Sequence, residues 1–149
     1  MNNQERCEWY AEMLEDAAFG RLYKCPECGE WVTYVEVTNK DADGDDVTLY
    51  RMSDGHTSDD KPEEITIYDW ISEMVFDWEF VIGRDMRYKY AVLTIAYGGP
   101  TVEVDTFHST VTLHFGIESV VCGYNPRIAL ILNDHFEELW YFKQNEALF

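Results

Sequence analysis

The motif with the clearest chemical potential is Cys25-Pro26-Glu27-Cys28-Gly29. Two cysteines that are separated by two residues can bind one Zn²⁺ at Zn–S distances of about 2.3 Å, and the glycine permits the tight turn between them. A structural zinc site needs four ligands, and the chain has no second Cys-x-x-Cys pair. The motif therefore predicts half of a zinc ribbon, with zinc as the candidate cofactor and Cys25 and Cys28 as candidate ligands.

The other two ligands have to come from the remaining thiols and imidazoles of the chain. These are Cys7, Cys122, His56, His108, His114 and His135. His56 follows a predicted hairpin, which is where the second ligand pair of a ribbon lies. The alternative is a tight turn with free thiols. A redox pair is disfavoured, because that chemistry places the first cysteine at a helix N-terminus and a strand is predicted after Cys28.

Asn39, Asp41, Asp43 and Gly44 match the opening of a calcium-binding EF-hand loop. The match ends at the twelfth position, where Tyr50 stands in place of the bidentate glutamate, and the flanking segments have strand patterns rather than helix patterns. An acidic hairpin turn explains these residues better, because aspartate and glycine suit turn geometry.

We find no constellation that is specific to catalysis. The chain has no Ser-His-Asp order, no Gly-x-Ser-x-Gly motif, no P-loop and no GxGxxG motif. Because the chain has 29 acidic residues, some pair of carboxylates will always be close, so a carboxylate hydrolase is not specifically indicated. We expect a protein without catalytic residues.

These motifs need a framework of helices and strands, which hydrophobic periodicity indicates. The predicted helices span 4–19, 67–78 and 125–143. The predicted strands span 30–37, 47–52, 88–97, 101–106 and 110–115, with a further short strand at 80–82, while 53–64 has almost no apolar residue and is predicted to be an exposed loop. The order α-β-β-α-β-β-β-α predicts one α+β domain over 1–149 with a mainly antiparallel sheet. Its acidic half is 1–80 and its β-rich half, with the C-terminal helix, is 81–149.

Two of these elements have particularly clear signals. Asn125 stands before Pro126, which is typical of a helix start, with asparagine as the N-cap and proline in the first turn. The nearly continuous apolar run in 88–97 predicts a central strand.

The balance of charge is unusually acidic. Asp and Glu number 29 against 11 Lys and Arg, so the net charge is −18. Residues 1–80 hold 21 acids and 6 bases, and the densest stretch, 41–79, holds 13 acids and 2 bases. Since nucleic-acid affinity comes mainly from Lys and Arg, this balance disfavours direct binding to nucleic acid or to an anionic membrane. The concentration in one half also disfavours a halophilic surface.

The sequence gives no sign of a membrane protein or a secreted one. No apolar run approaches the roughly 18 residues of a transmembrane helix, and residues 1–16 lack the pattern of a signal peptide. We therefore expect a cytoplasmic protein with reduced thiols.

An acidic surface with large aromatic residues can bind a basic groove, because carboxylates occupy the positions of phosphates and aromatics act as anchors. The alternatives are a solvated face that maintains solubility, and tryptophans, Trp70 and Trp78, that belong to the core. The candidate partner-binding residues are Asp41, Asp43, Asp45, Asp46, Asp59, Asp60, Glu63, Glu64, Asp69, Glu73 and Asp77.

The order of the motifs adds a resemblance. An N-terminal helix is followed by YKCPECGEW at 23–31, an acidic segment, YAVLTIAYGGPTVEVDT at 90–106, and an acidic helix that ends in EELWYF at 137–142. This order resembles small acidic accessory proteins encoded on phages and mobile elements. Some of them have a second cysteine pair where this chain has Arg51 to His56. The resemblance implies a counter-defence factor, such as an anti-restriction or anti-CRISPR protein that mimics DNA.

The expected function is therefore a non-enzymatic inhibitor that occupies the nucleic-acid groove of a nucleic-acid-binding host defence protein. The alternative is a zinc-ribbon-like adaptor that binds another protein through its aromatic residues. A hydrolase that uses carboxylates or a metal is a third hypothesis.

Overall fold

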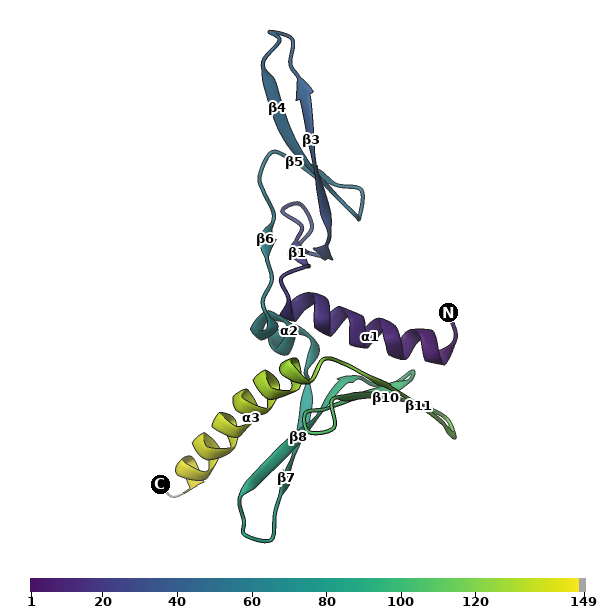
Figure 1. The fold of residues 1–149 in the computed structure, drawn as a ribbon, viewed down its shortest axis with the longest axis vertical. Helices are drawn as coiled ribbons and strands as arrows, with labels where there is room; N and C mark the ends of the chain where they lie inside the picture. The colour runs from purple at the N-terminus through teal and green to yellow at the C-terminus, as the bar shows by residue number, and fades with distance from the viewer. Residues whose placement is uncertain (148–149) are drawn as a thin grey trace. The chain divides into compact units, whose positions relative to one another are not determined.

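The computed structural model describes residues 1–147, and within them the chain forms three α-helices and eleven β-strands in three antiparallel sheets (Figure 1). The helices are α1 (Asn3–Ala18), α2 (Ile67–Met74) and α3 (Pro126–Ala147). The strands are β1 (Tyr23–Lys24), β2 (Trp31–Val32), β3 (Tyr34–Lys40), β4 (Asp46–Met52), β5 (Thr57–Ser58), β6 (Glu63–Glu64), β7 (Asp77–Ile82), β8 (Tyr88–Ala96), β9 (Thr101–Asp105), β10 (Thr110–Phe115) and β11 (Glu118–Gly123). The expected α+β class, with N-terminal, middle and C-terminal helices and antiparallel pairing, is confirmed.

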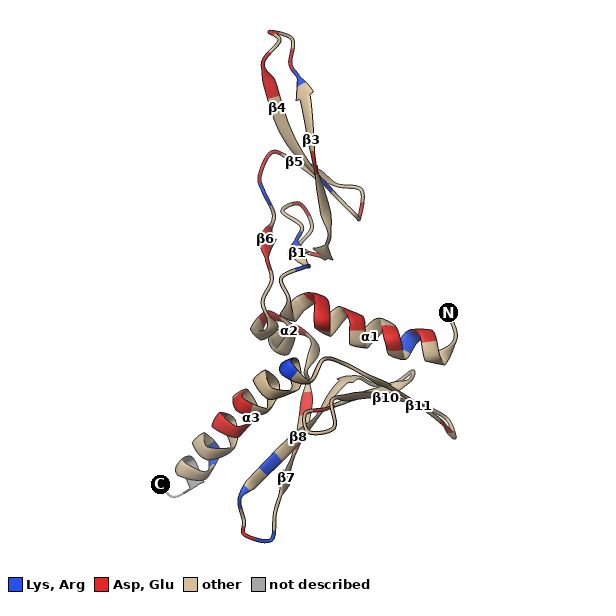
Figure 2. Ribbon diagram, in the orientation of Figure 1, with Lys and Arg blue, Asp and Glu red and all other residues tan. Residues whose placement is uncertain are grey.

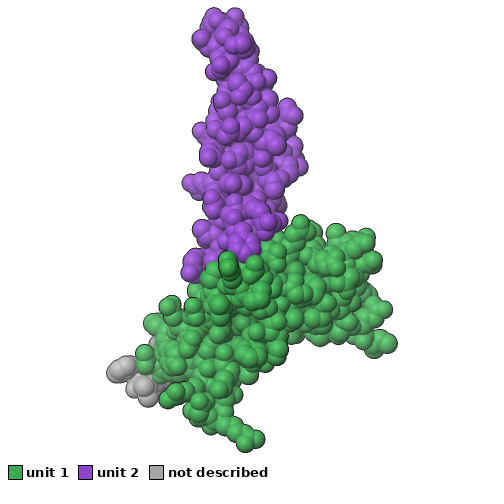
Figure 3. Space-filling view, in the orientation of Figure 1, with its two compact units in different colours: residues 1–15, 70–149 green, residues 16–69 purple. Residues whose placement is uncertain are grey.

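The chain divides into two compact units (Figure 3). Unit 1 comprises Met1–Glu15 and Trp70–Phe149, and unit 2 comprises Asp16–Asp69. In sequence, unit 2 is thus an insertion between the two segments of unit 1. The two boundaries between the units lie within α1 and within α2.

Unit 1 is built on a five-stranded sheet in the order β11-β10-β9-β8-β7, so every strand pairs with its neighbour in sequence. One cross-strand row in register contains Trp78, Leu93, Val104, Val111 and Cys122. Three of these side chains, Leu93, Val104 and Val111, are completely buried. This row marks the face of the sheet that lies against the core.

Helix α3 covers that face of the sheet. It begins where the sequence predicts, with the Arg127 N–H donating to Asn125 Oδ1 at 2.9 Å. Its buried side chains include Ile128, Leu132 and Phe136, spaced four residues apart, as one helix face requires. The ring of Phe136 lies 5.7 Å from that of Trp78.

The core of unit 2 is small. Its sheets are β2-β1-β6 and β3-β4-β5, and Cys25, Val32 and Met52 form a buried cluster against Tyr34 and Tyr50. Among the described residues, 23 apolar side chains are buried, and only six of them lie in unit 2. Units of this size rarely gain enough stability from apolar burial alone, and many natural ones add a metal or disulfides.

The structure corrects the prediction for the second helix. A helix over 67–78 is wrong, because α2 ends at Met74 and Trp78 lies in β7. Trp70 and Met74 share with Trp78 the four-residue spacing of a helix face. Trp78 and Phe80, however, alternate with acidic residues at the two-residue period of a strand, and pairing with β8 selects that period. Trp70 is fully buried and Trp78 is half-buried, as the core interpretation of these tryptophans expects.

Other differences concern the strands: β1 is not among the predicted strands, and the predicted strand over 30–37 is interrupted at Thr33, between β2 and β3. The segment 53–64, expected to be only a loop, contains β5 and β6, which are two residues each and have no periodicity to detect. Strand β11 is not among the predicted strands, although it completes the sheet of unit 1 by pairing with β10 over six residue pairs. Within the described part of the chain, no helix has both the length and the apolarity needed to cross a membrane.

The packing of α3 predicts a sharp contrast between two leucines of one helix. Leu132 is completely buried. Leu132→Ala should therefore open a cavity and lower the free energy of unfolding of unit 1 by about 2–5 kcal/mol. Leu130 is 65% exposed. Leu130→Ala should therefore change this free energy by less than roughly 0.5 kcal/mol. Urea unfolding monitored by circular dichroism measures both, and equal effects would contradict the assignment of the buried face.

Candidate metal centre

The first ligand pair lies in the turn between β1 and β2. The Cys25 N–H donates to the Glu30 carbonyl at 2.8 Å, and the Gly29 N–H donates to the Cys25 carbonyl at 2.9 Å. Gly29 has a positive φ, a conformation that glycine adopts without strain. The sequence Cys-Pro-Glu-Cys-Gly therefore folds into a closed turn that presents both thiols.

A second turn, between β4 and β5, lies opposite the first. The Met52 N–H donates to the His56 carbonyl at 2.8 Å, and the Gly55 N–H donates to the Met52 carbonyl at 3.0 Å. Asp54 Oδ1 accepts the His56 N–H at 3.0 Å, which fixes the carboxylate beside the imidazole.

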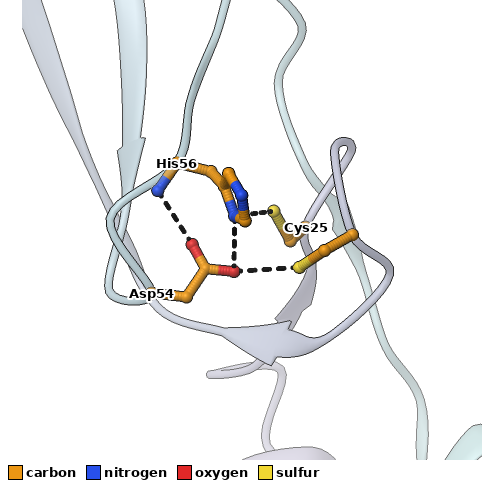
Figure 4. Close-up of side chains that lie close together, drawn as sticks. Cys25, Asp54 and His56 are labelled. Carbon is orange, nitrogen blue, oxygen red and sulfur yellow. Dashed lines mark hydrogen bonds and ion pairs between the residues drawn. The ribbon is translucent and has the colours of Figure 1, made fainter.

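The two turns bring four candidate ligands together (Figure 4). Cys28 Sγ lies 3.0 Å from Asp54 Oδ2, and His56 Nδ1 lies 3.1 Å from Asp54 Oδ2 and 3.7 Å from Cys25 Sγ. All four ligand atoms lie within 4.8 Å of one another. Ligand atoms around a tetrahedral ion with bonds of about 2.0–2.3 Å are separated by about 3.3–3.8 Å, so small side-chain shifts would complete such a shell.

One of the contacts that join the two turns is the hydrogen bond between Cys28 and Asp54. The Cys28 thiol donates to Asp54, and this hydrogen bond raises the pKa of Cys28 to about 11 while it lowers the pKa of Asp54. A cation at the same place would favour the thiolate instead. Cys25 is buried and the other three ligands are exposed, so the centre lies at the surface of unit 2. This group could hold a metal ion.

The other predicted ligand candidates do not join this group. His108 Nδ1 pairs with Asp105 Oδ2 at 2.8 Å, and His114 Nδ1 lies 2.8 Å from Ser119 Oγ. Cys7 and Cys122 belong to unit 1. The ring of His135, in α3, makes an edge-to-face contact with the ring of Phe136. Of the six candidates, only His56 lies with Cys25 and Cys28 in the described part of the chain.

Asp54 is not among the sequence candidates. A carboxylate at the turn between β4 and β5, two residues before His56, is the available signal. With 29 acidic residues in the chain, that signal does not distinguish Asp54 from the rest.

All eleven candidate partner-binding residues are exposed. Nine lie in unit 2, whereas Glu73 and Asp77 lie in unit 1. Figure 2 shows acidic residues at the tip of the β3–β4 hairpin and again at β6. Asp46 pairs with Lys40 Nζ at 3.0 Å. Across residues 1–147, none of the other ten forms an ion pair with a lysine or arginine.

Two of these carboxylates also have local structural roles. Asp41 Oδ1 accepts the N–H groups of Asp43 and Asp45, each at 2.9 Å, and so shapes the hairpin turn. This agrees with the interpretation of the segment as an acidic turn. Asp69 Oδ2 accepts the Thr66 N–H at 2.7 Å at the start of α2.

Comparison with known proteins adds no relative, since no family model, no curated protein and no solved structure matches this chain.

The hydrogen-bonded Cys28 thiol predicts how metal affinity depends on pH. Because its pKa is raised to about 11, the thiol keeps its proton at neutral pH, and a bound metal has to displace it. The apparent dissociation constant for Co²⁺ should therefore fall about tenfold per pH unit for each thiol proton displaced, between about pH 6 and pH 8. Titration of the thiolate-to-cobalt absorption band measures this. A dissociation constant that does not change with pH would exclude Cys28 as a ligand.

Proposed function

We propose that this protein is a non-enzymatic counter-defence inhibitor whose acidic surface on unit 2 binds the basic nucleic-acid groove of a host defence protein. The observation that carries this function is the set of exposed carboxylates without a lysine or arginine partner in residues 1–147. Carboxylates that pair with no cation of their own chain are available to the cations of another.

The density of charge favours unit 2 as the binding unit. Unit 2 holds 14 acids and 5 bases and unit 1 holds 15 acids and 6 bases, so each carries a net charge of −9. Unit 2, however, is the much shorter of the two. Duplex DNA presents one charge per about 1.7 Å of its axis, and a groove that binds it carries matching lysines and arginines. An acidic protein in such a groove would release the counterions of the groove and of its own surface, so its binding weakens with salt.

The metal that we propose for the four-residue group is zinc. Two thiols, one imidazole and one carboxylate match the ligands and the four-coordinate geometry that Zn²⁺ prefers. The ion would join the β1–β2 turn to the β4–β5 turn, and through β4 it would anchor the hairpin whose tip bears Asp41, Asp43, Asp45 and Asp46. This fits a unit with few buried apolar side chains, because structural zinc contributes directly to folding.

A second candidate function is a zinc-ribbon-like adaptor that binds a protein partner through aromatic residues. The four-residue metal group favours it. Trp70 is unavailable for such contacts because it is completely buried, whereas Tyr68 and Phe76 are each 58% exposed. The two functions differ in salt dependence, because aromatic anchors are not screened by ions whereas carboxylates are.

The zinc assignment predicts that each chain binds one zinc ion and that substitution of a ligand residue weakens this binding. Cys28→Ser and His56→Asn should each lower zinc affinity at least about 100-fold, since even the outer-shell partners of zinc ligands are worth about 10–100-fold. Competition with a chromophoric chelator measures the affinity. Cys122→Ser is the matched control, because it removes a thiol outside the group, and it should bind zinc like the unchanged protein. Full zinc affinity in Cys28→Ser would refute the site.

The inhibitor function predicts capture of a nucleic-acid-binding protein that both salt and DNA reverse. The immobilised protein should retain it from a bacterial lysate at low salt and release it at high salt or on addition of duplex DNA. A variant with Asp43→Asn, Asp45→Asn, Asp59→Asn and Glu63→Gln should bind it at least about 30-fold more weakly, which is about 2 kcal/mol. Asp41 and Asp69 are left unchanged, because Asp41 shapes the hairpin turn and Asp69 accepts a hydrogen bond at the start of α2.

The matched control removes the same number of charges from unit 1, through Glu12→Gln, Glu79→Gln, Asp134→Asn and Glu138→Gln. Glu12, Glu79, Asp134 and Glu138 are all exposed. This control should retain most of the affinity. Equal weakening by both variants would point to net charge rather than to unit 2, and capture that ignores salt and DNA would favour the adaptor.

A further inference from the structure

Two cysteines that neither the metal group nor the acidic surface uses lie in contact in unit 1. Cys7 Sγ, in α1, lies 3.0 Å from Cys122 Sγ, in β11. They are 115 residues apart in sequence. A disulfide bond is about 2.05 Å long, so the sulfurs need to approach by only about 1 Å to form one. Both thiols are free in this structure.

The two thiols differ in accessibility. Cys7 is completely buried, and its sulfur lies 3.2 Å from the Val111 carbonyl oxygen. Cys122 is partly exposed and lines a cavity of about 170 Å³. A small reagent can therefore reach Cys122 first, while Cys7 stands directly behind it.

Acidic side chains surround the access to Cys122. The other residues that line the cavity are Glu8, Ala11, Glu12, Glu15 and Gly123. Burial, the neighbouring Cys7 and the charges of Glu8 and Glu15 raise the pKa of Cys122 to about 12, so its thiolate is scarce at neutral pH and exchange is slow. The three carboxylates attract cations and repel anions.

We propose that Cys7 and Cys122 form a dithiol switch that closes to an intramolecular disulfide by exchange with a small cationic disulfide. The Cys122 thiolate attacks one sulfur of the reagent, forms a mixed disulfide and releases one small thiol. The Cys7 thiolate then attacks Cys122 Sγ and releases the second small thiol. The protein loses two electrons and two protons, and the reagent gains both as two thiols.

This bond would change how unit 1 is held together. Unit 1 consists of two segments, Met1–Glu15 and Trp70–Phe149, that unit 2 separates in sequence. A Cys7–Cys122 bond joins these segments directly and encloses the whole of unit 2 in the covalent loop. The closed form would keep the first turns of α1 attached to β11 when unit 2 unfolds or is cleaved.

The test treats the zinc-supplemented full-length protein with cystamine, which is cationic, or with the same concentration of glutathione disulfide, which is anionic. After alkylation of free thiols and digestion with trypsin without reductant, mass spectrometry should find peptide 7–21 linked to peptide 90–127, since lysine and arginine flank both segments. Cystamine should react about tenfold faster at low salt, and added salt should reduce the difference.

Two variants separate the charge effect from the bond itself. Glu8→Gln with Glu12→Gln should reduce the preference for cystamine while the same peptides become linked. In the Cys7→Ser variant, the exchange reaction should stop at a stable mixed disulfide on Cys122. The closed form of the unchanged protein should melt on the order of 5–10 °C higher than its reduced form.

Clear results would overturn the switch. A mixed disulfide that persists on Cys122 in the unchanged protein would show that Cys7 cannot reach it. Linked peptides that form equally fast with both reagents would refute the selection by charge. Linkage of Cys122 to Cys25 or Cys28 instead would show that the pair is not the reactive one.

Discussion

Mutual repulsion among carboxylates is the main constraint on the stability of unit 2. This unit carries 14 acidic and five basic side chains, while six buried apolar side chains oppose unfolding. Binding of a divalent ion would not relieve this repulsion, because it leaves the net charge of the site unchanged. A divalent ion that displaces two thiol protons adds two positive charges and removes two, so the net charge of the site does not change. The gain would be geometric, because one ion would fix the two turns that the hydrogen bond between Cys28 and Asp54 otherwise connects.

The helices and the longer strands could be predicted because local signals and tertiary contacts agree there. Asn125 and Pro126 start α3 where the N-cap rule places them, and Ile128, Leu132 and Phe136 follow on one face. Trp78 shows the opposite case, because its spacing fits a helix and a strand equally well. Only the pairing of β7 with β8 decides between them, and that contact is not visible in a local pattern.

Only part of the candidate metal group could be predicted, because some of its residues have a local sequence signal and others do not. The spacing of Cys25 and Cys28 is the spacing that lets two thiolates bind one metal ion, so sequence alone indicates this pair as candidate ligands. His56 was one of six candidates, and the position of a hairpin favoured it. Asp54 could not be singled out, because its selection depends on a backbone turn that brings one carboxylate of 29 beside a particular thiol.

The insertion of unit 2 into unit 1 has a consequence for the order in which the chain folds. A chain emerges from the ribosome N-terminal end first, and compact parts fold as units. All of Asp16–Asp69 is synthesised before the first residue of β7, whereas α1 meets its partner Cys122 only after β11 has been made. Unit 2 can therefore complete its turns before the sheet that packs against the segment Met1–Glu15 has been synthesised. We therefore expect the contact between the two most distant segments of unit 1 to form late in folding, because the entropy of loop closure opposes it.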